Sequence, residues 1–338
     1  MRSIIKFLIL AAIGGAPVSA LAQPSGVCAQ ASSPFLNAIC AKPNLAAGWN
    51  SLETAQAKLR DGLAPAEATH FDADILRWRR YFEAPCGEIG DPFERCVQDR
   101  LRDRHAWLAK LQNGPYPYIG FYGLRREGKR GKIAHEVDVR WLAFAAPGGD
   151  FDTANAEFAI GYDDDNIEKF IAETTESMRE VDDEREAHFE DLAWIDFDRP
   201  TPDLVNVWYG RSEYSGQPHA LYWDGCYLID WRTGKIIAQD QAFGPRRGWR
   251  DALAKIVHAE LVSQFKTNPG YSDKPPSRKK IAASFGETGP GFCWRADRLD
   301  VEYGLESLGP YSSGPYSIAI PYASIEKYLS GGPLRPKR

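Results

Sequence analysis

Six cysteines, all placed after residue 22, constrain this 338-residue chain more than any other feature. An even number of cysteines in an exported protein predicts disulfide bonds, because the compartments outside the cytoplasm are oxidising. Zinc ligation is the weaker alternative, since the chain has no C-x2-C pair and no histidine at ligand spacing from a cysteine. The sequence therefore predicts a disulfide-bonded fold with no metal site and no cofactor.

The first 22 residues have the features of a signal peptide rather than of a folded element. Arg2 and Lys6 make the start positive, residues 7–16 are a short apolar stretch, and Ala20-Leu21-Ala22 is a small-x-small cleavage pattern. The apolar stretch is too short to span a bilayer, and no second stretch of membrane length follows. We expect a periplasmic or secreted protein without membrane insertion.

The positions of the cysteines suggest how they pair. Four lie between residues 28 and 96, and two lie in the remainder of the chain. If these two parts fold separately, Cys226 pairs with Cys293 and closes a loop of 68 residues. Three connectivities are open for the first four, and pairing of chain neighbours favours Cys28–Cys40 and Cys86–Cys96.

Residues 23–112 are predicted to form a small all-α domain stapled by disulfides. Ser33-Pro34 is a typical helix start, and Asp91-Pro92-Phe93-Glu94 is a second, with an acidic cap and proline at the first helical position. Apolar residues between 45 and 111 recur at helical spacing, and Asn113-Gly114 ends the last run. Disulfide bonds add stability to a helical unit of only about 90 residues.

A stiff linker at residues 113–119, containing Pro115-Tyr116-Pro117-Tyr118, precedes a change of periodicity. In residues 120–332, strands are expected at 137–141, 204–209 and 299–305, and a hairpin at 221–238, because apolar and polar residues alternate or β-formers cluster there. Helical spacing at 249–265 and 324–329 adds helices. The second part is therefore predicted to be an α+β domain with a mainly antiparallel sheet.

The charge of the chain is uneven. Loss of the signal peptide with its two basic residues lowers the formal net charge from −5 to −7, which argues against nucleic acid as a partner. Residues 163–203 hold 16 acidic and 4 basic side chains, while Ile167 to Val181 keep one apolar face and predict an amphipathic helix. The segment is either a solvated helix face or a field that steers a basic partner.

No combination of residues predicts an active site, so we expect a binding protein and not an enzyme. His135-Glu136 lacks the second histidine of a zinc-protease motif, and residues 210–214 lack the last glycine of a nucleophile elbow. His219 stands alone in a turn, where hydrogen bonding is a commoner role than general-base catalysis. Hydrolysis of peptidoglycan is the weakest of the functional hypotheses.

The order of motifs in residues 26–112 follows one family of exported helical modules. Cys28 is followed by Ile39-Cys40, a Leu45-Ala46-Ala47 helix, a helix with Trp78 that ends near Cys86, and Cys96 at the start of a basic helix. This part resembles the LprI-type lysozyme-inhibitor domain. The resemblance implies a helical fold and a link to lysozyme.

The second part carries another set of family motifs. These are the strand from Val205, residues 216–219 where the family has Gly-Gly-x-His, the turn with Thr233-Gly234-Lys235, and the loop at residues 309–314. They resemble the domain of unknown function in RsiV-type anti-sigma factors and some peptidoglycan deacetylases, although Gln217-Pro218 replaces small residues of the family. RsiV-type proteins bind lysozyme through this region, so the resemblance implies recognition of lysozyme or the cell envelope.

Two loops are the candidate contact surface. Pro310 and Pro315 restrict the loop at residues 309–316, and its glycines permit tight turns, so little entropy is lost on docking. The alternative is that Tyr311 and Tyr316 only cover the core. The resemblance favours binding, with the turn at residues 214–219 as a neighbouring candidate. The expected partner-binding residues are Pro310, Tyr311, Ser312, Ser313, Gly314, Tyr214, Gly216 and His219.

The two resemblances and the charge of −7 together suggest a function. We expect an exported periplasmic binding protein that recognises lysozyme, a basic protein, and the sequence leaves open whether binding inhibits it. The alternative is a cell-envelope module that binds peptidoglycan glycan through exposed aromatic side chains, without lysozyme inhibition.

Overall fold

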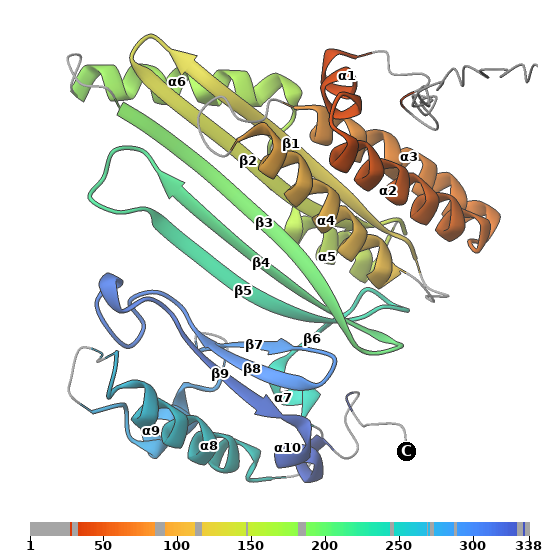
Figure 1. The fold of residues 1–338 in the computed structure, drawn as a ribbon. Coiled ribbons are helices and arrows are strands. Elements are labelled where there is room, and N and C mark those ends of the chain that lie inside the picture. Colours follow the sequence, from red (N-terminus) through yellow and green to blue (C-terminus); the bar gives the residue numbers. More distant parts are fainter. Residues whose placement is uncertain are drawn as a thin grey trace, which may run out of the picture.

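The computed structural model describes residue 28 and residues 33–84, 92–111, 117–146, 148–181, 187–243, 247–268, 270, 274–286, 289–329 and 334. Among these residues, helices come first, a six-stranded sheet follows, and a three-stranded sheet with its own helices comes last (Figure 1). The predicted signal peptide lies outside the described residues. In the part of the chain that is described, no helix has the length and apolar character needed to cross a membrane.

The first and last of the N-terminal helices begin at or next to the predicted starts, at Pro34 and Phe93, whereas the starts at Pro43 and Pro65 were not predicted. Ser33 caps the first helix, because its Oγ accepts a hydrogen bond from the Leu36 backbone N–H at 3.2 Å. Proline occupies the first turn of three of these helices, where a missing N–H breaks no helical hydrogen bond. The helices are α1 (Pro34–Cys40), α2 (Pro43–Asp61), α3 (Pro65–Glu83) and α4 (Phe93–Leu111).

The larger sheet has its strands in sequence order and confirms the mainly antiparallel prediction. Only the pairing of β2 with β3 is parallel, and α5 (Asp150–Phe158) and α6 (Asp164–Val181) lie in the connection between these two strands. The strands are β1 (Ile119–Arg130), β2 (Ile133–Phe144), β3 (Ala187–Thr201), β4 (Leu204–Tyr214), β5 (Leu221–Asp230) and β6 (Ile236–Ile237).

The smaller sheet is antiparallel in the order β7-β8-β9 and lies beside β5 (Figure 1). In the strand at residues 298–303, the predicted alternation of buried apolar and exposed polar side chains holds only in part, because Asp300 is only 4% exposed. The side chains of Arg295 and Arg298 donate to its carboxylate and make this burial possible. The elements here are α7 (Gln239–Ala242), α8 (Trp249–Gln264), α9 (Arg278–Ser284), β7 (Gly291–Trp294), β8 (Arg298–Tyr303), β9 (Tyr316–Pro321) and α10 (Tyr322–Leu329).

Two of the predicted disulfides are confirmed. Cys28–Cys40 joins the N-terminus of the described chain to α1, and Cys226–Cys293 joins β5 to β7, with Cα atoms 5.6 and 5.2 Å apart. Cys96 is also disulfide-bonded, and Cys86, its predicted partner, lies outside the described residues. The covalent link from β5 to β7 fixes the smaller sheet against the edge of the larger one.

The helical part and the larger sheet share one hydrophobic core. Trp107 of α4 packs edge-on against Phe121 and Phe197, with ring centroids 5.6 and 4.9 Å apart. Asp74 of α3, fully buried, accepts hydrogen bonds from Arg104 at 2.7 Å and from Tyr118 Oη at 2.8 Å. The boundaries at residues 112 and 119 stay predictions, but Tyr118 of the predicted linker is anchored in this core.

Helices cover both faces of the larger sheet. Neighbouring residues of a strand point to opposite faces. Asp138 of β2 accepts a hydrogen bond from Tyr81 of α3 at 2.8 Å, while Val137 and Val139 belong to the same buried cluster as Ile167 of α6. The sheet is therefore a central layer between α3 and α6.

The acidic segment contains two elements, of which the sequence predicted one. The amphipathic helix over Ile167 to Val181 is confirmed as α6, whereas residues 187–201 form the long strand β3. Three acidic side chains of this strand have basic partners, so much of its charge is compensated within the molecule. The pairs are Asp191–Arg211, Asp196–Lys110 and Asp198–Arg295, with shortest nitrogen–oxygen distances of 2.7, 2.5 and 3.1 Å.

Candidate functional site

The two predicted contact loops lie against each other. One is the turn between β4 and β5, and the other is the connection between β8 and β9. The rings of His219 and Tyr311 stack with centroids 4.3 Å apart and an interplanar angle of 18°. We call the residues Tyr214, Gly216, His219 and Pro310 to Gly314 the loop surface. The sequence could suggest each loop, but only the fold brings them together.

Gln217 fixes the conformation of the first loop. Its Oε1 accepts hydrogen bonds from the backbone N–H and the hydroxyl of Ser215, and its Nε2 donates to the Glu213 carbonyl at 3.0 Å. Gly216 adopts a φ of +93°, which favours glycine. The turn therefore presents Pro218 and His219 to solvent, and Gln217, a departure from the family pattern, stabilises it.

Hydrogen bonds through Asn268 anchor the base of the second loop. Asn268 donates to the Ser313 carbonyl at 2.5 Å, and the Tyr316 hydroxyl donates to the Asn268 carbonyl at 3.1 Å. Tyr316 is 1% exposed and belongs to the core, as the alternative expectation had it. Tyr311 is half-buried and covers His219 instead. Pro310 and Ser312 are exposed, so the loop has a fixed base and an accessible tip.

The acidic helix α6 extends to the loop surface. A Cβ atom on Gly216 would lie 3.7 Å from Met178 Cε, near the end of this helix. Some of its carboxylates have basic partners, such as Glu168 with Arg126 and Arg130 at 3.2 and 2.8 Å. Glu173 and Glu176 are mostly solvent-exposed and are paired only along the helix itself. The end of this acidic helix therefore lies next to the first of the two loops.

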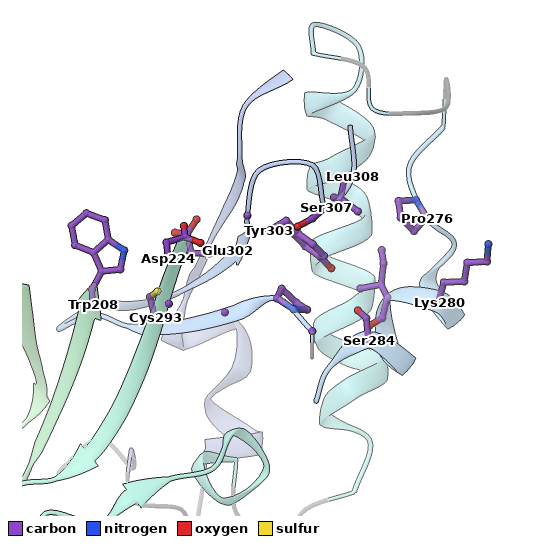
Figure 2. Close-up of a pocket in the computed structure, with 16 residues that line it drawn as sticks. Trp208, Asp224, Pro276, Lys280, Ser284, Cys293, Glu302, Tyr303, Ser307 and Leu308 are labelled. Atoms are coloured by element: carbon purple, nitrogen blue, oxygen red, sulfur yellow. The ribbon is translucent and has the colours of Figure 1, made fainter. Parts of the chain in front are cut away.

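A pocket of about 500 Å³ lies directly below the loop surface. It is bounded by β5, by β7 and β8, and by α9, and the chain that leads from β8 to Pro310 forms one wall. Figure 2 shows Asp224 and Glu302 together with Trp208 at one end, and Ser284 and Pro276 at the other. We call this cavity the acidic pocket.

Asp224 and Glu302 are unusual because both carboxyls have raised pKa values. Burial raises the pKa of Asp224. Burial also raises the pKa of Glu302, and the charges of Asp300 and Asp224 add to this rise, whereas a hydrogen bond from Ser317 opposes it. Neither residue was predicted from the sequence, since an acidic residue in a strand looks like any other solvent-facing position.

A second cavity of about 230 Å³ lies between the helical part and the sheet. Trp107, Trp194 and Trp208 line it, together with Arg104, whose guanidinium bonds to Asp74 at 2.7 Å. Among the described residues, no three His, Cys, Asp or Glu side chains cluster closely enough to hold a metal ion. Compared with this second cavity, the acidic pocket lies nearer the loop surface, because Ser307 and Leu308, which precede Pro310, line it.

Comparisons with known proteins give only partial matches to solved structures. No family model matches the chain, and no curated protein matches it. A member of the DUF3298 family from Bacteroides fragilis is 16% identical with a TM-score of 0.45, over 66% of this chain and 99% of its own. A DUF3298 family protein from Pseudomonas aeruginosa is 17% identical with a TM-score of 0.40, over 66% and 98%. Neither likeness assigns a ligand or a partner, and the resemblance to LprI-type domains stays a prediction.

Proposed function

We propose that this protein is an exported binding protein that recognises lysozyme through the loop surface. The observation that supports this most is the stacking of His219 on Tyr311, which turns two separate loops into one continuous aromatic surface. Aromatic side chains with a fixed base are common binding anchors, because they bury much area and lose little conformational entropy. On this proposal the protein acts by binding and not by catalysis.

The charge distribution supports a basic partner. The mature chain has a formal charge of −7, and α6, which carries exposed carboxylates, ends next to the first of the two loops. Complementary charge speeds the encounter of two proteins more than it tightens the final complex. The aromatic loops would then contribute most of the binding affinity, and the acidic helix would increase the association rate.

Truncation of Tyr311 tests the proposal. We expect Tyr311→Ala to weaken lysozyme binding by about 1 to 3 kcal/mol with little change in melting temperature, because the half-buried side chain packs on His219 and not in the core. Calorimetric titration into lysozyme measures the affinity. Tyr328→Ala, which truncates another half-buried tyrosine on α10, is the matched control.

Tyr316→Ala provides the contrast. Removal of this fully buried ring should lower the folding stability by about 3 to 5 kcal/mol, because apolar burial is lost and a cavity is left behind. If Tyr311→Ala instead melts early and its folded fraction binds lysozyme normally, the loop is structural and the proposal is wrong. Lytic rates measured in the same titration would decide whether binding inhibits.

A glycan-binding module is the second candidate, and Trp223 is the observation in its favour. Its side chain is 46% exposed on β5, beside Leu221 at 48%, and exposed indoles stack well on sugar rings. Sedimentation with purified peptidoglycan sacculi separates the two functions. Loss of sacculus binding in Trp223→Ala, with no affinity for lysozyme in the parent protein, would favour this candidate.

A further inference from the structure

We propose that the acidic pocket binds a small aliphatic ligand that carries a primary ammonium group at one end and an oxygen acceptor at the other. Asp224 and Glu302 would hold the ammonium, and the Tyr303 hydroxyl would donate to the acceptor. The inference concerns a cavity below the loop surface and does not depend on lysozyme binding.

The carboxylates of the pocket have no cationic partner among the described residues. Asp224 makes no hydrogen bond or ion pair there, and Glu302 accepts one hydrogen bond, from the Ser317 hydroxyl at 2.8 Å. The pocket brings them close to the chain that follows β8, since a Cβ on Gly304 would lie 3.3 Å from Asp224 Oδ1. Two carboxylates from different sheets therefore face one cavity without a directly bonded cation, and the charge of Arg295 offsets only part of the rise in the pKa of Glu302.

The basic side chains nearby are already engaged. Arg295 bonds to Asp300 at 3.0 Å and to Asp198 at 3.1 Å, and Arg298 bonds to Asp300 at 2.8 Å. Lys280 lines the cavity with its stem, and Figure 2 shows its amine extending away from Asp224 and Glu302. Among the described residues, no basic side chain bonds to either carboxylate, so a cationic ligand would supply the missing partner.

Burial of unpaired carboxylates is costly unless something compensates for it. The raised pKa values of Asp224 and Glu302 reflect this cost. A bound ammonium would restore the charged forms and donate up to three hydrogen bonds. A divalent cation fits less well, because no group of three His, Cys, Asp or Glu side chains among the described residues could hold a metal ion, and Cys293, which lines the pocket, is disulfide-bonded.

The other end of the cavity offers a hydrogen-bond donor. Tyr303 is 6% exposed, and its hydroxyl makes no hydrogen bond within 3.5 Å to a described group, although the nearby Ser284 hydroxyl partly opposes the rise in its pKa that burial causes. Ser284 beside it donates to the Ile281 carbonyl at 2.8 Å. Figure 2 shows the Tyr303 ring directed from β8 toward Ser284, and Gly291 also lines the pocket. A ligand that spans the cavity would therefore place an oxygen near Tyr303.

The size of the cavity suits a ligand of this kind. A volume of about 500 Å³ falls in the range of small-molecule sites, and Trp208 and Leu308 supply apolar walls for an aliphatic chain. An ammonium on such a chain can belong to a free small amine or to a lysine side chain of a peptide. The experiment below separates these sources.

Calorimetric titration of the mature protein with 6-amino-1-hexanol tests the proposal. We expect saturable binding, and none of 1,6-hexanediol, which replaces the ammonium by a hydroxyl. Asp224→Asn and Glu302→Gln should each weaken binding at least tenfold, because each removes one charge from the ammonium site. Glu326→Gln makes the same change of charge on the exposed face of α10 and should bind like the parent.

Melting temperatures at pH 7 provide a second readout. Asp224→Asn should be at least as stable as the parent, since it removes a half-buried carboxylate with no bonded cation, and an unchanged melting temperature excludes unfolding as the cause of lost binding. Equal binding of the amine and the diol, or equal binding by all the variants, would overturn the proposal, as would no binding at all. A blocked glycyl-lysyl-glycine peptide that binds as well as the free amine would identify protein lysines as the source, and failure of the peptide would identify small amines.

Discussion

Asp138 on β2 illustrates how single residues join the helical part to the sheet. Its carboxylate accepts hydrogen bonds from Tyr81 of α3 and from Arg125 of β1, and it also contacts Arg140 at 3.3 Å. Burial alone would raise the pKa of Asp138, but the guanidinium groups of Arg140 and Arg125 outweigh it and lower the pKa to about 2. The ionised form is thus favoured by folding.

This residue predicts a pH dependence of stability. Because the folded pKa lies below the unfolded value near 4, ionised Asp138 contributes about 2 to 3 kcal/mol at neutral pH, and this contribution is lost as the pH falls from 4 toward 2. Urea unfolding of Asp138→Asn should show a large loss of stability at pH 6 and a smaller one at pH 2.5. Asp297→Asn, at an exposed position, is the control. A loss of the same size at both pH values would contradict the assignment.

At the scale of elements, α6 predicts a rate effect. Glu173 and Glu176 are exposed on α6, the helix whose Met178 lies near Gly216, so Glu173→Gln/Glu176→Gln should slow association with lysozyme and flatten its salt dependence, with dissociation nearly unchanged. Stopped-flow binding at two ionic strengths measures this. Glu326→Gln/Asp297→Asn removes the same charge elsewhere. An unchanged association rate would support the alternative interpretation, in which α6 is only a solvated helix face.

The two disulfides at known positions predict unequal contributions to stability. Cys226–Cys293 closes a sequence separation of 67 and Cys28–Cys40 one of 12. Loop entropy gives about 4 kcal/mol for the first and about 3 kcal/mol for the second. Chemical denaturation of the two double serine variants would compare them. Since the first bridge also fixes the smaller sheet, we expect Cys226→Ser/Cys293→Ser to lose more, and the reverse order would contradict this account.

At the scale of the whole molecule, the shared core predicts cooperative unfolding. Tyr118, Phe121 and Phe197 would lose their cover if α3 and α4 separated from the sheet. We therefore expect scanning calorimetry of the mature protein to show one transition for the helical part and the larger sheet together. Two well-separated transitions, with the helical part melting by itself, would instead support an independent N-terminal domain.

Local patterns in the sequence were enough to predict most of the elements. Ser33 and Pro34 begin a helix because capping and proline geometry act within one turn, and Leu299 and Val301 mark a strand because alternation needs only neighbouring residues. The Cys226–Cys293 pair followed from the division of the chain into two parts. These features depend on short stretches or on simple counting.

The tertiary structure alone decided the site. His219 meets Tyr311, and Asp224 meets Glu302 across one cavity, because the Cys226–Cys293 bridge and the packing of β7 against β5 set the smaller sheet beside the larger one. The same holds for Asp74, whose burial depends on Arg104 and Tyr118 arriving from other elements. Contacts between residues far apart in the chain follow from long-range packing, which no local pattern of residues encodes.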